Sequence, residues 1–284
     1  MVTAEFSVQV CSGSREEALV LLAAFLPKAG TSYTRNRNFD LGAGQHKHVS
    51  QLSAYIKRRI ITEEDVLKKV LSAHSLNEAG KFIDEIFWRT YFKGWLESRP
   101  HIWMQYCADV HHLTHELQTQ SGLRDRWAAA CLGETGIDCF DAWAKELAET
   151  GYLHNHARMW FASIWVYTLQ LPWQLGADFF LRHLLDGDAA SNTLSWRWVV
   201  GLHSVGKTYL ARAENIQRFT NGRFAPKGLA QVAPPLNDTA STMAPKIIDP
   251  PNPYLEGRKT GLLLHSDDLN IAHLTHRSDC IASA

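Results

Sequence analysis

Apolar residues return at three- and four-residue steps through most of the chain up to Val200, the spacing that places them on one face of an α-helix. Few segments alternate apolar and polar residues with the two-residue period of a β-strand. Helices are therefore expected at Arg15 to Phe25, Ser50 to Arg59, Thr62 to His74, Ala79 to Glu97, Trp103 to Gln118, Cys139 to Glu149, His154 to Leu169, Gln174 to Leu185 and Ala189 to Val200. Thr62 and Asp65 fit a capping box at the start of one of them. The pattern predicts an all-α fold.

Composition divides the chain into three parts. Residues 1–30 are expected to form a helical segment packed on the core, and residues 31–224 a helical domain. Within that domain the polar, Gly-containing run Thr31 to His48 is expected to be a shaped loop. Residues 225–284 are rich in Pro and small polar residues, which predicts a largely irregular C-terminal extension with one short strand at Thr260 to His265.

Bulk charge and cysteine usage bound the class of protein. Lys plus Arg equals Asp plus Glu at 29 each, so any phosphate-binding surface must be a local patch. The five cysteines are scattered, odd in number and free of C-x-x-C pairs, which favours a reducing compartment, and no secretion signal is recognised. The most apolar stretch, Met159 to Trp173, is too short to span a bilayer. We expect a cytoplasmic protein without a membrane segment.

Two local patterns suggest chemistry that their context does not support. Residues Gly201 to Thr208 read Gly-Leu-His-Ser-Val-Gly-Lys-Thr, which formally matches a phosphate-binding P-loop. A P-loop follows a buried strand, whereas this segment follows a helical series, so nucleotide hydrolysis is not expected. His111 and His115 lie one helical turn apart, but no Cys or Glu ligand is arranged around them, and no metal site is expected.

One helix and two helix starts carry side chains that could line a cleft. Glu85, Trp88, Arg89 and Phe92 share a face of one helix, although an aromatic stripe at this spacing is more often part of a core. Asn155 and Arg158 lie one turn apart at a helix start.

The segment Asp186-Gly187-Asp188 combines a turn with a helix cap. Gly187 allows the tight turn, and Asp188 is placed to cap the helix that carries Asn192. Asp186 could pair with Arg158 as a buried ion bridge.

Three motifs occur in order along the chain: Glu85-x-x-Trp88-Arg89, His154-Asn155-x-x-Arg158-Met159, and Asp186-Gly187-Asp188-x-x-x-Asn192-x-x-x-Trp196-x-Trp198. With them, the chain from about Tyr33 to Phe224 resembles the helical FAD-binding domain of the DNA photolyase and cryptochrome family. Upstream, Val49 to Tyr55 resembles the family's flavin phosphate-binding segment, although Val49 and Gln51 depart from its usual residues. The resemblance includes nothing of the family's amino-terminal α/β antenna domain, so a short form is expected.

The resemblance implies FAD as the cofactor and assigns residues around it. Asn192 matches the residue that faces flavin N5. The residues implied to bind FAD are Tyr33, Val49, Ser50, Gln51, Leu52, Ser53, Arg89, Asn155, Arg158, Asp186, Gly187, Asp188 and Asn192.

The resemblance also implies light-driven repair of cyclobutane pyrimidine dimers by a deoxyribodipyrimidine photolyase-like lyase. The residues implied to act on the dimer are Glu85, Trp88, Asn155, Met159 and Trp198. The implied partner is damaged DNA, single-stranded or duplex. His156 stands where many such enzymes have Arg, which weakens one expected phosphate or lesion contact.

Photoreduction in the family uses three tryptophans. Trp196 and Trp173 match the inner two, whereas the outer position falls near Gln120, so the electron path is expected to end at a different aromatic residue or to be slower.

Two other functions remain open from the sequence. One is a cryptochrome-like blue-light receptor whose C-terminal extension binds a protein partner, which the neutral charge balance and His156 favour. The other is a flavin-binding protein with neither role.

Overall fold

The computed structural model describes residues 13–238, 240, 243–248, 260–261, 265–270 and 280–281. The helices are α1 (Arg15–Phe25), the 3₁₀ turn η1 (Leu26–Lys28), α2 (Thr31–Asn36), α3 (Ser53–Lys57), α4 (Glu63–Ala73), α5 (Leu76–Glu97), α6 (Pro100–Thr119), α7 (Ser121–Leu132), α8 (Asp138–Thr150), α9 (Asn155–Ser163), the π-helical turn η2 (Ile164–Thr168), α10 (Trp173–His183), α11 (Ala189–Val199) and α12 (Ala213–Phe219). The strands β1 (Thr260–Gly261) and β2 (Cys280–Ile281) form one short parallel pair. Apart from that pair, the described residues confirm the predicted all-α fold.

Local sequence signals set most helix boundaries. Thr62 and Asp65 form the predicted capping box at the start of α4, because each side chain bonds the other residue's backbone N–H. Three expectations need correction. The polar run predicted as a loop contains α2, the helix predicted at Ser50 to Arg59 is only α3, and both α7 and α12 were missed. Of the strand predicted at Thr260 to His265, β1 is seen, and residues 262–264 lie outside the described part.

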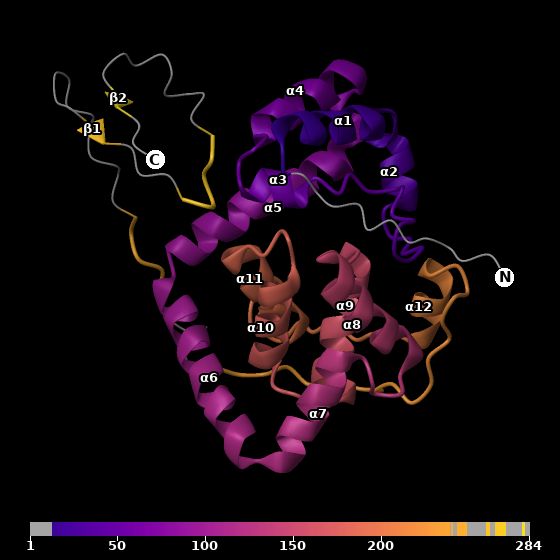
Figure 1. The fold of residues 1–284 in the computed structure, drawn as a ribbon, viewed down its shortest axis with the longest axis vertical. Coiled ribbons are helices and arrows are strands. Elements are labelled where there is room, and N and C mark those ends of the chain that lie inside the picture. Colours follow the sequence, from indigo (N-terminus) through magenta and orange to yellow (C-terminus); the bar gives the residue numbers. More distant parts are fainter. Residues whose placement is uncertain are drawn as a thin grey trace.

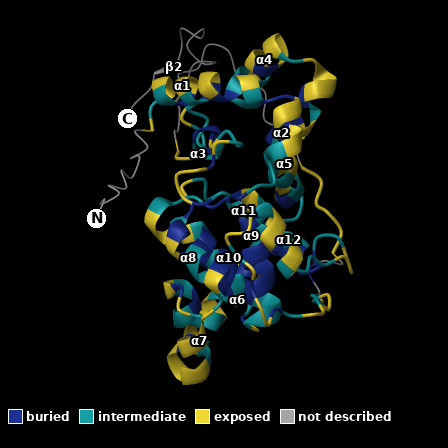
Figure 2. Ribbon diagram, turned by 90° about the vertical axis from the view of Figure 1, so that its right-hand side faces the viewer, coloured by how far each residue is buried: buried dark blue, intermediate teal, exposed yellow. Residues whose placement is uncertain are grey.

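The helices form two groups joined by α5. Figure 1 shows α1 to α4 above and α6 to α12 below, with the long helix α5 running diagonally from one group toward the other. Leu22, Val66 and Phe82 belong to the core of the upper group, whereas Trp143 and Trp165 belong to the larger core of the lower group. Figure 2 shows the buried residues concentrated in the lower group, around α9 and α10.

Tryptophan side chains fill the lower core, as their number predicted. Trp143, Trp160 and Trp165 are fully buried, and each indole N–H donates a hydrogen bond, to Asp40 Oδ2, Asn215 Oδ1 and Pro172 O respectively. Buried indoles therefore keep their single donor satisfied at these three positions.

Two negative expectations concern particular segments. The P-loop-like residues Gly201 to Thr208 follow α11 and form turns, with no strand before them in the described chain, which confirms that their context is wrong for a P-loop. None of the helices in the described ranges is long and apolar enough to cross a bilayer.

Candidate functional site

A cavity of about 790 Å³ lies where the two groups of helices meet. Its walls come from α2, α3, α5, α9 and α11, together with the loop before α3 and the turn after α10. This volume falls in the range of small-molecule and cofactor sites, roughly 300–1,000 Å³. All the sequence-predicted site residues line the cavity except Gly187 and Trp173.

The two exceptions have other surroundings. A Cβ on Gly187 would lie 2.9 Å from Leu181 O and 3.0 Å from Leu184 O, so the glycine is needed to close the turn after α10. Trp173 is buried on α10 beside Tyr106, away from the cavity wall.

The face of α5 predicted to line a cleft does so. Glu85, Trp88, Arg89 and Phe92 all reach the cavity. Trp88 is 48% exposed, which is incompatible with the alternative that this stripe is part of a core. The Glu85 carboxylate forms an ion pair with Arg37, the C-cap residue that follows α2. An acid, a cation and an accessible indole are thus held side by side.

A partly buried ion pair joins α9 to the turn after α10. Arg158 Nη2 lies 3.2 Å from Asp186 Oδ2, and Arg158 Nε donates to Leu153 O at 2.8 Å, which confirms the predicted pair. Burial alone would raise the pKa of Asp186, but the Arg158 guanidinium, with the Ser53 hydroxyl and Arg89, outweighs it and holds that pKa below its ordinary value. Asp186 is therefore a carboxylate at neutral pH.

Asp188 caps α11 and also meets two cations. Its Oδ1 accepts from Ser191 N at 2.7 Å, the N-cap bond that the sequence predicted. Its Oδ2 lies 3.7 Å from Arg89 Nη1 and 3.6 Å from Lys93 Nζ. One carboxylate therefore fixes the helix start and orients an arginine at the cavity wall.

The segment before α3 is held in an uncommon backbone conformation. Gln51 has φ 54°, in the left-handed region that disfavours a non-glycine residue. The bond from Arg89 Nη2 to Ser53 O at 3.3 Å ties the start of α3 to α5. Strain of this kind is kept only where the surroundings over-determine it, and here it shapes a wall of the cavity.

A hydrogen bond to the backbone of α10 orients the Asn192 side chain. Its Nδ2 donates to Ala177 O at 2.8 Å, and the residue is 8% exposed. This bond fixes the plane of the amide on the cavity wall.

Histidines beside the cavity are neutral at pH 7. Burial lowers the pKa of His156, whose Nδ1 lies 3.0 Å from Asn38 O and whose ring stacks on Trp160. Burial also lowers the pKa of His154 to about 4. His156 thus does not supply the positive charge of an arginine at its position.

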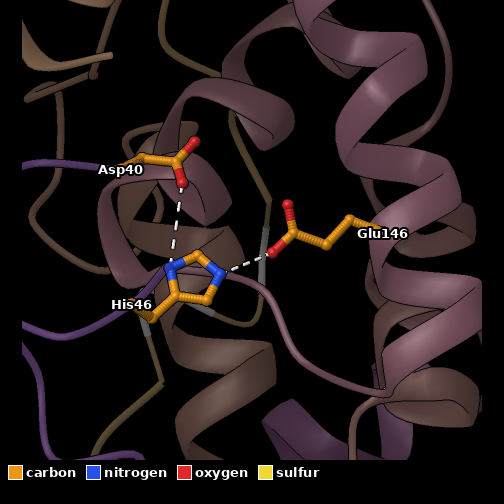
Figure 3. A group of neighbouring side chains, drawn as sticks. All are labelled: Asp40, His46 and Glu146. Atoms are coloured by element: carbon orange, nitrogen blue, oxygen red, sulfur yellow. Dashed lines mark hydrogen bonds and ion pairs between the residues drawn. The ribbon is translucent and has the colours of Figure 1, made fainter. Parts of the chain in front are cut away.

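A buried polar cluster anchors the loop between α2 and α3 (Figure 3). His46 lies between two carboxylates, with Nε2 2.6 Å from Glu146 Oε1 and Nδ1 3.9 Å from Asp40 Oδ1. These three residues bring ligand-type atoms within 4.8 Å of one another. Asp40, however, already accepts from Trp143 Nε1 and lies 3.7 Å from Arg223 Nη1. Through these contacts the cluster ties the loop between α2 and α3 to α8 and to Arg223.

Comparison with known proteins assigns the chain to a family. A profile of the family described as the FAD binding domain of DNA photolyase matches residues 82–228, more than half of the 284 residues. The chain belongs to this family.

Relatives and solved structures agree with the assignment to the photolyase FAD-binding family. The deoxyribodipyrimidine photo-lyase of Alkalihalophilus pseudofirmus is 29% identical over 189 residues, 66% of this chain and 38% of that protein. A class III photolyase from Agrobacterium tumefaciens superposes with a TM-score of 0.57 at 24% identity, covering 73% of this chain and 43% of that one. A Synechocystis cryptochrome gives 0.62 at 20% identity, covering 76% and 45%. The chain spans less than half the length of each, and the two structures show the fold alone.

The cavity has the donors that FAD requires. Arg89 Nη1, Ser191 Oγ and Trp196 Nε1 are buried and have no hydrogen-bond partner within the described residues. An unpaired buried donor costs about 1–3 kcal/mol, which a ligand acceptor would recover. A guanidinium, a hydroxyl and an indole N–H are donors of the kind that the oxygen and nitrogen acceptors of a flavin dinucleotide can bind. The residues present therefore fit FAD.

Several lining residues escaped the sequence analysis. Tyr91, Phe180 and His203 line the cavity without belonging to a motif, and the Arg37–Glu85 pair joins residues 48 positions apart. Only the helical spacing of Tyr91 from Trp88 could have indicated one of them.

Proposed function

We propose that this domain binds FAD in the cavity and repairs cyclobutane pyrimidine dimers in DNA under blue light. The observation that carries the proposal is that one cavity combines buried donors without a hydrogen-bond partner among the described residues with an accessible indole and a carboxylate, Trp88 and Glu85. FAD, when bound and reduced, supplies an electron to the dimer on excitation and takes it back after the ring has opened. The relative from Alkalihalophilus pseudofirmus is named a deoxyribodipyrimidine photo-lyase.

The cofactor-binding role falls to the inner wall. Arg89, held by Ser53 O and Asp188, presents a guanidinium N–H to a phosphate. Val49 to Ser53, the segment that resembles the family's phosphate-binding segment, also lines the cavity. With them, we assign cofactor contacts to Tyr33, Val49, Ser50, Gln51, Leu52, Asn155, Arg158, Asp186 and Asn192, and assign Gly187 to shaping the turn between Asp186 and Asp188.

The dimer-binding role falls to the outer wall. A base taken out of the helical stack can rest against an aromatic side chain, and Trp88 offers a half-exposed indole for this. Glu85 accepts hydrogen bonds from base edges while Arg37 holds its other side. Asn155, Met159 and Trp198 complete this wall.

His156 adds no positive charge near the outer wall, and the charge of Arg37 is paired with Glu85. Because burial lowers the pKa of His156, that ring is neutral at pH 7. The weakened phosphate contact predicted from the sequence remains part of the proposal, and it makes DNA affinity depend on few cations.

A blue-light receptor is the second candidate, and one contact favours it. In the C-terminal extension, Asp267 forms an ion pair with Lys57 of α3, and Asp268 lies 3.4 Å from Arg59 Nε. Helix α3 carries Ser53 of the cavity wall, so a change at the cavity would reach this contact through one short helix. A receptor would use it to release the extension to a protein partner.

Repair of a dimer-containing oligonucleotide separates the two candidates. Purified protein with bound, photoreduced FAD is illuminated with blue light, and restored thymines are counted for the wild type, Glu85→Ala and Trp88→Ala. The repair proposal expects light-dependent restoration that both substitutions reduce. Photoreduction without any repair by the wild type would contradict it and would favour the receptor.

A further inference from the structure

Aromatic side chains lead from the cavity toward α10. Trp196 lines the cavity and is 2% exposed. Its ring rests on α10 at Gly176, where an added Cβ would lie 2.3 Å from Trp196 Cη2. Trp173 is one helical turn before Gly176 on the same helix. The inner indole is therefore packed against the helix that carries the next one.

The row continues from Trp173 to α6. The Tyr106 ring stacks on Trp173 with centroids 5.7 Å apart and an interplanar angle of 27°. The Trp103 ring lies 5.2 Å from Tyr106 at 34°. Trp173 and Tyr106 are 5% and 4% exposed, whereas Trp103 is half-buried. Trp103 is thus the member of this row that reaches solvent.

The neighbouring branch does not lead outward. Trp165 lies 6.2 Å from Trp196, but it is fully buried. Its ring neighbour Phe179 stacks on it at 6.2 Å and is much harder to oxidise than an indole. If Trp165 were oxidised, Phe179 would not provide an electron from the protein surface to reduce it again.

The Tyr106 ring is placed to bridge Trp173 and Trp103, but among the described residues its hydroxyl lacks an acceptor for the proton that a tyrosine loses on oxidation. Its hydroxyl is buried and has no hydrogen-bond partner in the described part of the chain. Burial, with the Asp178 carboxylate adding to it, raises the pKa of Tyr106. A phenol is oxidised readily only when its proton can leave. Tyr106 should therefore mediate electron transfer between Trp103 and Trp173 without becoming a tyrosyl radical itself.

We propose that Trp103 is the terminal electron donor for flavin photoreduction in this protein, reached from Trp196 and Trp173 across the ring of Tyr106. The inference rests on the proposed binding of FAD. Photoexcited oxidised FAD gains one electron and Trp103 loses one. The indole N–H proton of Trp103 then passes to water. An external thiol returns one electron and one proton to Trp103, which restores the indole and leaves a thiyl radical. The polar residue at the expected outer position, Gln120, has no part in this route.

Photoreduction without DNA tests the route. The FAD-bound protein is illuminated anaerobically with a thiol, and the loss of oxidised-flavin absorbance is followed for Trp103→Phe, Tyr106→Phe and Tyr106→Leu. The matched control is Trp127→Phe, the same change at another half-buried tryptophan, on α7. We expect Trp103→Phe and Tyr106→Leu to slow photoreduction severalfold, whereas Tyr106→Phe and Trp127→Phe keep the wild-type rate.

A second readout does not depend on the rate. After illumination without thiol, mass spectrometry of peptides should find indole oxidation concentrated at Trp103. Controls kept in the dark should show no oxidation of Trp103. This measurement covers the case in which Tyr106→Leu does not fold.

The outcomes separate the route from the function. A wild-type rate in Trp103→Phe, or oxidation concentrated at Trp127, would overturn the route, and slowing by Tyr106→Phe would overturn the bridging role. Failure of the wild type to bind FAD would refute the proposed function instead.

Discussion

Replacing Asp186 with Asn removes the carboxylate that faces Arg158 while keeping the side chain's shape. The Arg158 Nη2 and Asp186 Oδ2 atoms are 3.2 Å apart. Two unit charges at this distance attract by about 5 kcal/mol at an effective dielectric constant of about 20. The Arg158 side chain is 24% exposed and keeps its bond to Leu153 O, so water and that bond recover part of the loss. We expect the free energy of unfolding of the flavin-free protein to fall by about 2 kcal/mol, less than the roughly 3–5 kcal/mol for breaking a fully buried pair.

A surface pair on α10 provides the matched control. Arg182 Nε lies 2.7 Å from Asp178 Oδ2, one helical turn apart, and the Arg182 side chain is 68% exposed. Asp178→Asn makes the same chemical change, yet it should cost only about 0–1 kcal/mol because the charges are screened by water.

Urea denaturation and the ratio of bound FAD to protein together provide the assay. Asp186→Asn should lower both, whereas Asp178→Asn should leave the FAD ratio unchanged. The pKa of Asp186 is held below its ordinary value, so its stabilisation is present at neutral pH and is lost as the pH falls through that lowered value. The deficit of Asp186→Asn should therefore shrink on acidification. Equal effects of the two substitutions on unfolding and on FAD would refute this account of the pair.

Three further changes test the outer wall, a buried histidine and a close helix contact. Trp88→Ala should weaken binding of dimer-containing DNA by about 1–3 kcal/mol in a titration, with FAD content unchanged because the side chain is 48% exposed; unchanged DNA affinity would exclude stacking. Burial lowers the pKa of His154 to about 4, so this group should lower the free energy of unfolding by about 2 kcal/mol between roughly pH 7 and roughly pH 5. His154→Asn, which keeps a capping side chain, should lose that part of the pH dependence in urea titrations, and an unaltered dependence would place the titration elsewhere. Gly176→Ala, whose Cβ would lie 2.3 Å from Trp196, should destabilise by about 1–3 kcal/mol in thermal or urea unfolding. A Cβ added at Gly80 on α5 would have nothing within 4 Å, so Gly80→Ala should stabilise the protein by about 1 kcal/mol. A loss of stability in both alanine variants would contradict the close packing of Trp196 on Gly176.

Local chemistry made much of the helical framework predictable. The Thr62–Asp65 capping box and the Asp188 cap act within three residues, so the sequence alone displays them. Helix α7 was missed because its apolar residues do not form a stripe and Gly122 interrupts its first turn. Helix α12 has only seven residues, too few for a periodic pattern.

The walls of the cavity were predictable by motif but not by physical pattern alone. Arg37 and Glu85 are 48 residues apart, and no local pattern near either residue indicates that they meet. The left-handed backbone at Gln51 is likewise imposed by the packing around it. Resemblance located the segments that carry the site, and the Asp186–Arg158 pair was predicted from the sequence, whereas only the fold showed that Arg37 neutralises Glu85.

Titration of the flavin-free protein with FAD, set against FMN, tests most directly the claim that the cavity is a flavin dinucleotide site. We expect one FAD per chain and much weaker binding of FMN, because Arg89 and the segment Val49 to Ser53 are placed to contact the dinucleotide's phosphates. Substituting Arg89 with Met should bring the dissociation constants of FAD and FMN closer together. Binding of FMN as tight as that of FAD, or binding of neither, would contradict the account.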